Sequence, residues 1–232
     1  HMSGARYIST GMDRLDAFLG GGIQPGKIYH IYGPSSSGKT TLALQIINSE
    51  LSLGKRVIWI ETEKKNFLKR LETMIPVEQF PSKLKNIIVF SPYSFSQQSL
   101  LVNRLTNFIG PKINLIVFDT ITNLYRSSLL EKMDNIKLNK EINRQMALIK
   151  SMCAIKSVSC ILLNQVRSDI NVEYLKADPV ANKIILYWCD FNIEIVNLNN
   201  QQKKLNIVSN DEEQRRLSLI CEVTSEGFKQ KS

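Results

Sequence analysis

The sequence is poor in the features that mark several common protein classes. Only four of its 232 residues are cysteine and only two are histidine, one of them at position 1. No C-x-x-C pair occurs, so the spacing that structural zinc sites use is missing. No apolar run reaches the roughly 18 residues that span a bilayer, and no signal-peptide pattern opens the chain. We therefore expect a cytoplasmic protein with no membrane partner, whose cysteines are reduced and buried in apolar surroundings.

What the chain does contain is typical of a folded domain, apart from its charge. Hydrophobic residues make up 43% and charged residues 22%, which excludes a disordered tail, a collagen-like chain and a disulfide-rich miniprotein. The formal net charge of +9 favours an anionic partner, namely a nucleotide, a nucleic acid or a membrane surface, without choosing among them. His1 and Met2 are typical of a cloning scar, and the length predicts that residues 3–232 form a single domain.

Apolar runs alternate with helix-like segments over the first two thirds of the chain. Five apolar runs predict strands, and they lie at 28–32, 57–60, 87–90, 115–118 and 160–163. The last four are continuous, which is typical of parallel strands covered on both faces. Helical spacing occurs between them, at 39–53, 66–74, 96–109 and 138–155. The last third predicts antiparallel strands at 191–195, 205–208 and 217–223. The sequence thus predicts an α/β fold with a mostly parallel, doubly wound sheet and an antiparallel C-terminal extension.

The strongest chemical signal is a loop between the first predicted strand and the first long predicted helix. It matches the pattern G-x-x-x-x-G-K-S/T in full with Gly33, Pro34, Ser35, Ser36, Ser37, Gly38, Lys39 and Thr40. Its glycines let backbone N–H groups surround phosphate oxygens, and the helix amino terminus adds a partial positive charge. We predict that Lys39 contacts the β- and γ-phosphates of a nucleotide and that Thr40 completes a Mg²⁺ shell. The alternative is a polar turn with a chance lysine.

Polar residues follow three of the other predicted strands. Asp119 ends the fourth apolar run, where a carboxylate lies at the ligand edge of such a sheet and can hold Mg²⁺ through water. Glu61 and Glu63 follow the second run, and one of them could polarise an attacking water as a general base. Gln165 follows the fifth run and could sense the γ-phosphate. Polar residues at strand ends are common, so capping of the following turn is the alternative for each.

These motifs, in their order along the chain, resemble the RecA/RadA recombinase family. The likeness runs from about residue 8 to residue 227, and a chain of this length is most similar to archaeal RadB-like recombinase paralogs. The matching segments are 9–11, 20–22, 33–41, 61–63, 115–119, 125–126, 144–146 and 164–166.

The resemblance implies roles for individual residues. Glu63 matches the catalytic glutamate of the family, and Gln165 matches the glutamine that couples the γ-phosphate to DNA binding. Thr41 extends the phosphate-binding loop, and Arg70 matches an arginine near the adenine. Two DNA-binding loops are implied, a first at residues 125–139 and a second at residues 166–182. The candidate DNA contacts are Arg126, Lys132, Lys137 and Arg167, with a solvated surface charge as the alternative for Arg126.

The chain also departs from the family pattern. The N-terminal helical DNA-binding domain and the filament-assembly linker are missing from this sequence, so strand exchange by this chain alone is not expected. Lys64 and Lys65 follow Glu63 where the family usually has glycine, which favours an ionised base and alters the positioning of water. Residues 122–144 hold five basic and three acidic residues, whereas residues 165–183 hold three of each. We therefore expect weak, salt-dependent binding of single-stranded DNA.

We expect a single RecA-like ATPase domain over residues 3–232 that uses ATP and Mg²⁺. The expected function is that of an ATP-binding, weakly hydrolysing recombinase paralog that assists the main recombinase in homologous recombination and DNA repair. Its expected partners are the main cellular recombinase or other paralogs, in a homo- or hetero-oligomer. Two alternatives stay open: a signalling ATPase of the circadian-clock type without a DNA function, and a non-hydrolysing scaffold that binds ATP to stabilise a partner interface.

Overall fold

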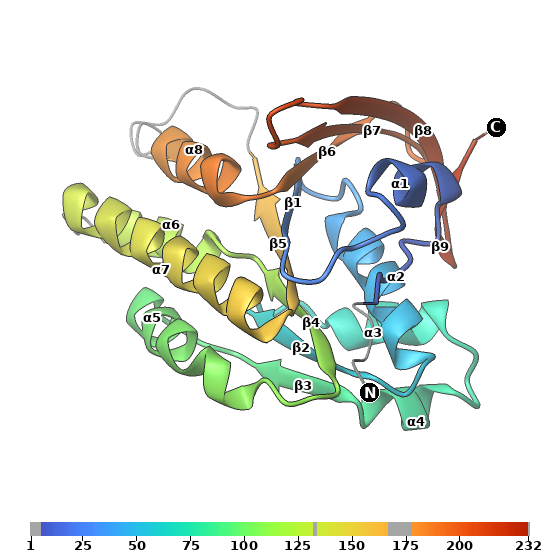
Figure 1. The fold of residues 1–232 in the computed structure, drawn as a ribbon, viewed down its shortest axis with the longest axis horizontal. Helices are drawn as coiled ribbons and strands as arrows, with labels where there is room; N and C mark the ends of the chain where they lie inside the picture. Colours follow the sequence, from blue (N-terminus) through green and yellow to red (C-terminus); the bar gives the residue numbers. More distant parts are fainter. Residues whose placement is uncertain (1–5, 132–133, 167–177, 232) are drawn as a thin grey trace.

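A computed structural model describes residues 6–131, 134–166 and 178–231 (Figure 1). Within these residues, nine strands form one sheet in the order β3-β2-β4-β5-β1-β6-β7-β8-β9. The parallel strands are β1 (Ile28–Gly33), β2 (Arg56–Glu61), β3 (Ile87–Phe90), β4 (Ile113–Asp119), β5 (Ser159–Gln165) and β6 (Phe191–Asn197). The antiparallel extension is β7 (Gln202–Ser209), β8 (Arg216–Thr224) and β9 (Gly227–Gln230). This architecture confirms the fold class that the sequence predicts. It differs at 191–195, which the sequence assigns to the antiparallel extension, because this segment lies in β6 and β6 pairs parallel with β1.

Helices cover both faces of the parallel part of the sheet, as Figure 1 shows. One face carries α1 (Asp13–Phe18), α2 (Lys39–Leu51), α3 (Phe67–Met74) and the short α4 (Phe80–Leu84). The other carries α5 (Phe95–Arg104) with the 3₁₀ turn η1 (Leu105–Phe108), α6 (Asn123–Leu130), α7 (Asn135–Lys156) and α8 (Asp178–Trp188).

An apolar core lies on each face of the sheet, and the continuous apolar runs in the sequence contribute side chains to both cores. In β4, Leu115 and Val117 pack on the side of α2, whereas Ile116 and Phe118 pack on the side of α5 and α7. All four side chains are fully buried. Because successive side chains of a strand point to opposite faces, only a strand covered on both sides needs every residue apolar.

The structure differs from the sequence expectation in the segment assigned to the first DNA-binding loop. Residues 123–130 form helix α6, and α7 begins at Asn135, so little of 125–139 is an open loop. Leu124, Tyr125 and Leu129 supply the reason, because this i, i+1, i+5 set lies on one side of a helix and is buried against the second core. Most of the second implied loop, with Arg167, lies outside the described residues, and so does Lys132.

The buried cysteines follow the prediction. Cys153, Cys160, Cys189 and Cys221 are all buried and carry free thiols. No helix in the described ranges combines the length and apolar character that crossing a bilayer requires.

Candidate nucleotide-binding site

The predicted phosphate-binding loop joins the end of β1 to the start of α2, at the carboxyl edge of the parallel strands. Gly33 leaves no room for a side chain, because a Cβ there would lie 2.4 Å from the carbonyl oxygen of Ile195 in β6. Gly38 has a φ of +99°, in the left-handed region that glycine adopts without steric cost. These two glycines allow the tight loop conformation directly before the amino terminus of α2, and a helix amino terminus favours an anionic ligand.

Lys39 is held inside this loop. Its side chain is buried, and its Nζ donates hydrogen bonds to the carbonyl oxygens of Gly33 at 3.1 Å and of Pro34 at 2.6 Å. The pKa of Lys39 is lowered to about 8, chiefly by burial and also by the nearby Lys65, while Asp119 acts in the opposite direction. The two carbonyls and the Ser37 hydroxyl, which accepts at 3.4 Å, are all neutral, so the buried ammonium would gain most from an anionic oxygen, which a nucleotide phosphate provides.

The residues expected at Mg²⁺ are brought together across the sheet. Thr40 Oγ1 donates a hydrogen bond of 3.0 Å to Asp119 Oδ2, although the two residues are 79 positions apart. Burial raises the pKa of Asp119, while the Thr40 hydroxyl and Lys65 lower it. Glu61 lies opposite Asp119 in the β2–β4 register, and its Oε1 is buried without a hydrogen-bond partner among the described residues. A hydroxyl, a carboxylate and an unpartnered carboxylate oxygen form a donor set that fits hydrated Mg²⁺.

A hollow of about 300 Å³ opens at this loop. It is lined by Ser35, Ser36, Gly38, Lys39, Thr40, Thr41, Lys65, Asp119, Thr120 and Gln165. Gln165 reaches it because β5 pairs with β1 in a register that sets Gln165 beside Gly33. The next residue, Val166, donates its backbone N–H to the Gly33 carbonyl at 3.1 Å. Thus the residue expected to sense the γ-phosphate lies at the loop expected to bind it.

Glu63 and Lys65 form an ion pair beside this hollow. Glu63 itself lines an adjoining hollow of about 510 Å³, together with Glu61, Lys64 and Lys65. Lys65 lines both hollows, so it lies between the expected base and the phosphate-binding loop. The sequence indicated two cations near Glu63, but it could not show that one of them engages its carboxylate.

Arg126, a candidate DNA contact, is tied to the same edge of the sheet. Its Nη2 donates to the Asn164 side-chain oxygen at 3.2 Å and to the backbone carbonyl of Gln165 at 2.5 Å. Asn164 is fully buried, accepts a hydrogen bond of 2.6 Å from Thr122 and donates one of 2.7 Å to Asn182 of α8. In the sequence, Asn164 is simply the polar residue that follows the fifth apolar run, before Gln165. In the structure it connects α6, β5 and α8 next to Gln165.

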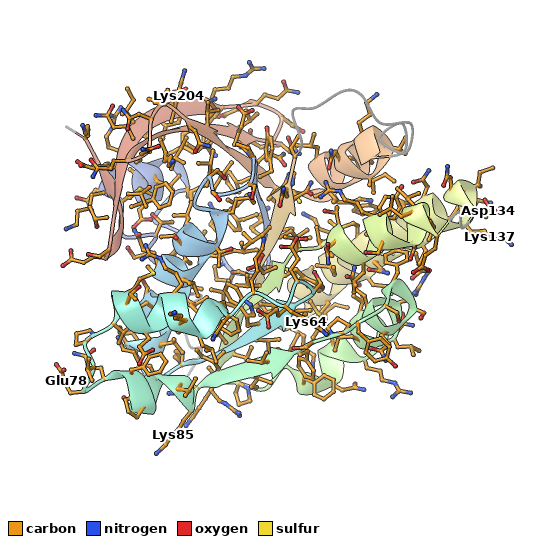
Figure 2. All side chains as sticks on the ribbon, turned by 180° about the vertical axis from the view of Figure 1, so that it is seen from behind. Lys64, Glu78, Lys85, Asp134, Lys137 and Lys204 are labelled. Carbon is orange, nitrogen blue, oxygen red and sulfur yellow. The ribbon has the colours of Figure 1, made fainter. Side chains whose placement is uncertain are left out.

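The remaining candidates lie apart from this network. Arg70 of α3 donates to Thr41 Oγ1 at 3.3 Å and to the Thr224 carbonyl at 3.1 Å, so it bridges the start of α2 and the end of β8. Lys137 is exposed in the first turn of α7, and its Nζ lies 3.9 Å from Asp134 Oδ2. Figure 2 shows both residues at the outer rim of the molecule, where α7 begins.

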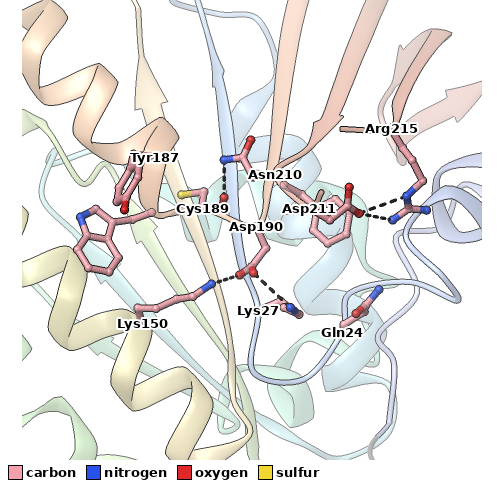
Figure 3. A pocket seen from close by; sticks show the side chains of 11 residues that line it. Gln24, Lys27, Lys150, Tyr187, Cys189, Asp190, Asn210, Asp211 and Arg215 are labelled. Atoms are coloured by element: carbon pink, nitrogen blue, oxygen red, sulfur yellow. Dashed lines mark hydrogen bonds and ion pairs between the residues drawn. The ribbon is translucent and has the colours of Figure 1, made fainter. Parts of the chain in front are cut away.

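A different hollow, of about 440 Å³, lies where β6 begins (Figure 3). Its central carboxylate, Asp190, accepts hydrogen bonds from Lys150 Nζ at 2.6 Å, Lys27 Nζ at 3.3 Å and the Ile28 backbone N–H at 2.8 Å. Asp190 is therefore satisfied by partners from α7 and β1. We assign it a structural role in joining these elements.

Comparisons with known proteins agree with this geometry. The family model described as the RecA N-terminal domain matches residues 3–231. Curated relatives named "DNA repair and recombination protein RadB" include one from Methanosphaera stadtmanae, 32% identical over 183 residues, which are 78% of this chain and 77% of the relative. One from Thermococcus kodakarensis is 34% identical over 184 residues, which are 78% of this chain and 80% of the relative.

A solved structure gives the same result in three dimensions. The chain is similar to one titled "Crystal structure of the RadB recombinase", with a TM-score of 0.75 and 27% sequence identity. The match covers 95% of this chain and 98% of the other.

Proposed function

This chain belongs to the RecA N-terminal domain family, and from that membership we propose that it is a recombinase paralog acting in DNA repair and homologous recombination. We propose that it binds ATP with Mg²⁺ and hydrolyses the nucleotide slowly. Nucleotide use follows from the family. The residues that perform it, and the partner that it serves, belong to the proposal.

One observation carries the proposal: the Thr40–Asp119 hydrogen bond joins the phosphate-binding loop to the strand end expected at Mg²⁺. Around it, Lys39 is buried on neutral carbonyls and Gln165 lies beside Gly33. A loop that merely turned the chain would not need a buried ammonium within it and a buried carboxylate brought to it from the end of β4.

In the proposed reaction the loop N–H groups and Lys39 bind the phosphate oxygens, and Lys39 neutralises charge that develops on them. Thr40 and Asp119 would hold Mg²⁺, directly and through water, and the ion would supply further neutralisation of phosphate charge. Glu63 would accept a proton from the attacking water as general base. Arg70, with its guanidinium beside Thr41, would lie near the adenine.

Gln165 and Arg126 are proposed to pass the state of the γ-phosphate to the DNA-binding segments. Gln165 lines the nucleotide hollow with its side chain, and its backbone carbonyl accepts a hydrogen bond from Arg126 of α6. A shift of Gln165 on phosphate binding would therefore act on α6 directly and, through Asn164, on α8. The proposed partners are single-stranded DNA, bound weakly, and the main cellular recombinase or another paralog.

The experiment that tests this function is ATP turnover with and without single-stranded DNA. Turnover that rises on adding DNA would support a recombinase paralog. Turnover that does not change when DNA is added in low-salt buffer would contradict this function and favour a signalling ATPase. A pull-down from native extract with and without ATP, probed for the cellular recombinase, would test the partner.

The scaffold alternative has one observation in its favour. Lys65 engages the Glu63 carboxylate, which a general base needs to present to water. A protein that keeps this pair when ATP is bound would hold the nucleotide without consuming it. Tight ATP binding with no turnover in either DNA condition would favour this alternative.

A further inference from the structure

Of the six parallel strands, β1–β5 are all preceded by basic segments, whereas β6 is preceded by Asp190, which pairs with Lys27 and Lys150. Together the five basic segments contain seven lysines and arginines and no aspartate or glutamate, in a chain whose net charge is +9. The segments are residues 24–28, 52–56, 83–87, 109–113 and 154–158. Because parallel strands begin at one edge of the sheet and end at the other, this basic edge lies opposite the nucleotide-binding loop.

Two of these seven cations have structural partners. Lys27 pairs with Asp190 in the hollow of Figure 3. Lys83 is buried at the end of α2, where its Nζ donates to Asn48 Oδ1 at 2.7 Å and to Ser52 Oγ at 2.9 Å. Lys83 is therefore held at the carboxyl end of α2, where its positive charge compensates the negative end of the helix dipole.

Four others behave differently, and we call Lys55, Arg56, Lys85 and Lys112 the amino-edge cluster. The seventh cation is the exposed Lys156 at the end of α7, and we do not count it in the cluster. The side chains of the cluster form no hydrogen bond or ion pair with any residue in the described ranges, and all except the half-buried Lys55 are exposed. Figure 2 shows Lys85 projecting outward at the lower rim of the molecule.

The backbone fixes the cluster on three adjacent strands. The N–H of Arg56 donates to the carbonyl of Lys112 at 2.9 Å, so the starts of β2 and β4 are aligned. The N–H of Val57 donates to the carbonyl of Asn86 at 3.0 Å, which aligns the residue after Lys85 with the start of β2. Neighbouring strands lie about 4.8 Å apart, so the cluster spans about 10 Å along the edge before side-chain reach is added.

We propose that the amino-edge cluster binds the phosphate backbone of double-stranded DNA, without regard to base sequence and without need for ATP. Duplex DNA carries one phosphate charge per about 1.7 Å of helix axis, so about 10 Å presents roughly six charges to four cations. The five basic segments hold no aromatic residue. A surface for single strands would use aromatic rings to stack bases, whereas a duplex exposes chiefly its phosphates.

Charge also favours DNA over an acidic protein as the occupant. Protein–protein interfaces are depleted in lysine and enriched in aromatic residues, which is the opposite of this cluster. Two aliphatic residues near the cluster in the sequence, Leu53 and Leu84, are exposed. Two isolated leucines are fewer than the continuous apolar patch that marks a protein interface. This surface goes beyond the proposed function, because it requires neither the phosphate-binding loop nor the first DNA-binding loop.

The test is duplex binding by a variant in which all four cations are neutralised: Lys55→Gln, Arg56→Gln, Lys85→Gln and Lys112→Gln. The matched control removes four cations from the antiparallel extension and the chain end: Lys204→Gln, Arg216→Gln, Lys229→Gln and Lys231→Gln. Both variants carry the same net charge, so non-specific attraction is equal. Fluorescence anisotropy with a short duplex of mixed sequence, in the absence of nucleotide, measures affinity across a range of salt concentrations.

Each phosphate that the variant no longer neutralises should reduce the slope of log affinity against log salt by about 0.9. Between about 50 and about 200 mM salt, the affinity of the control should therefore fall about 100-fold further than that of the amino-edge variant. Equal slopes for the two variants would overturn the proposal and leave an acidic protein as the occupant to test. Loss of duplex binding on the Lys39→Ala change would also overturn it, since the phosphate-binding loop would then take part in duplex binding.

A folding control keeps the result interpretable. The variant with Lys55→Arg, Lys85→Arg and Lys112→Arg retains every charge and should bind the duplex as the unaltered protein does. If the neutralised variant unfolds at a lower temperature, retained binding by this second variant still supports phosphate contact. Reduced binding by a folded Arg variant would contradict the proposal, because the proposal needs only the positive charges and no contact with the bases. Failure of ATP binding or turnover would leave the duplex result unaffected, so the two proposals fail separately.

Discussion

Changing Lys65 to glutamine should raise the rate of ATP hydrolysis. Lys65 forms an ion pair with the Glu63 carboxylate and also lines the phosphate hollow. The Lys65 side chain is 60% exposed, whereas that of Glu63 is 18% exposed. An ion pair with one member so exposed is worth about 0.2–1 kcal/mol. Releasing Glu63 to orient water therefore lowers the barrier by at most about 1 kcal/mol, or about fivefold in rate.

The measurement is phosphate release at saturating ATP and Mg²⁺, with single-turnover conditions if steady-state turnover is slow. Lys64→Gln is the matched control, because Lys64 is exposed, adjacent and carries the same charge, but has no ion pair with a described residue. The gain should shrink as salt is added, since salt screens an exposed pair. A tenfold fall in kcat for Lys65→Gln alone would refute the reasoning, because Lys65 would then act on the phosphate and not on Glu63.

Three further outcomes are expected. Glu63→Gln should lower turnover by about 10²–10⁴-fold with ATP binding kept, measured by phosphate release and nucleotide titration; normal turnover would make Glu61 the base. The Arg126→Ala, Lys132→Ala and Lys137→Ala triple variant should weaken single-stranded DNA binding about equally for any sequence, seen in gel shifts at low and physiological salt; tight binding that survives would place the DNA contacts elsewhere. Burial lowers the pKa of His30 to about 4, so the unfolded chain takes up this proton first as the pH falls below about 6.5. Stability should drop by roughly 3 kcal/mol between those pH values, and His30→Gln should remove that part of the drop in urea unfolding.

The sequence predicted most of the parallel sheet and the phosphate-binding loop for a local reason. Residues 33–40 are contiguous, and β2, β3, β4 and β5 each contain an uninterrupted apolar run, so both signals survive without knowledge of contacts. The end of β4 at Asp119 follows from the same pattern. These features are set within a few residues of chain.

What the sequence could not provide depends on contacts between distant residues. Arg126 meets Asn164 across 38 positions, and its partners are not visible in the local pattern of α6. Strand β9 has only four residues and is defined by its pairing with β8. The amino-edge cluster is likewise scattered over separate segments, and only the strand order brings it together. The pattern of apolar residues predicts individual helices and strands, but it does not predict which strands become neighbours in the sheet.

Binding of a fluorescent ATP analogue by the unaltered protein and by Lys39→Ala tests the central claim most directly. Lys39 is the one loop lysine, and its ammonium lies buried among the loop carbonyls, whereas Lys65, the other lysine at the hollow, is 60% exposed and paired with Glu63. We expect Mg²⁺-dependent binding by the unaltered protein, and loss of that binding in a variant whose circular dichroism spectrum is unchanged. Undiminished binding by the folded variant would contradict the assignment of residues 33–40 as the nucleotide site.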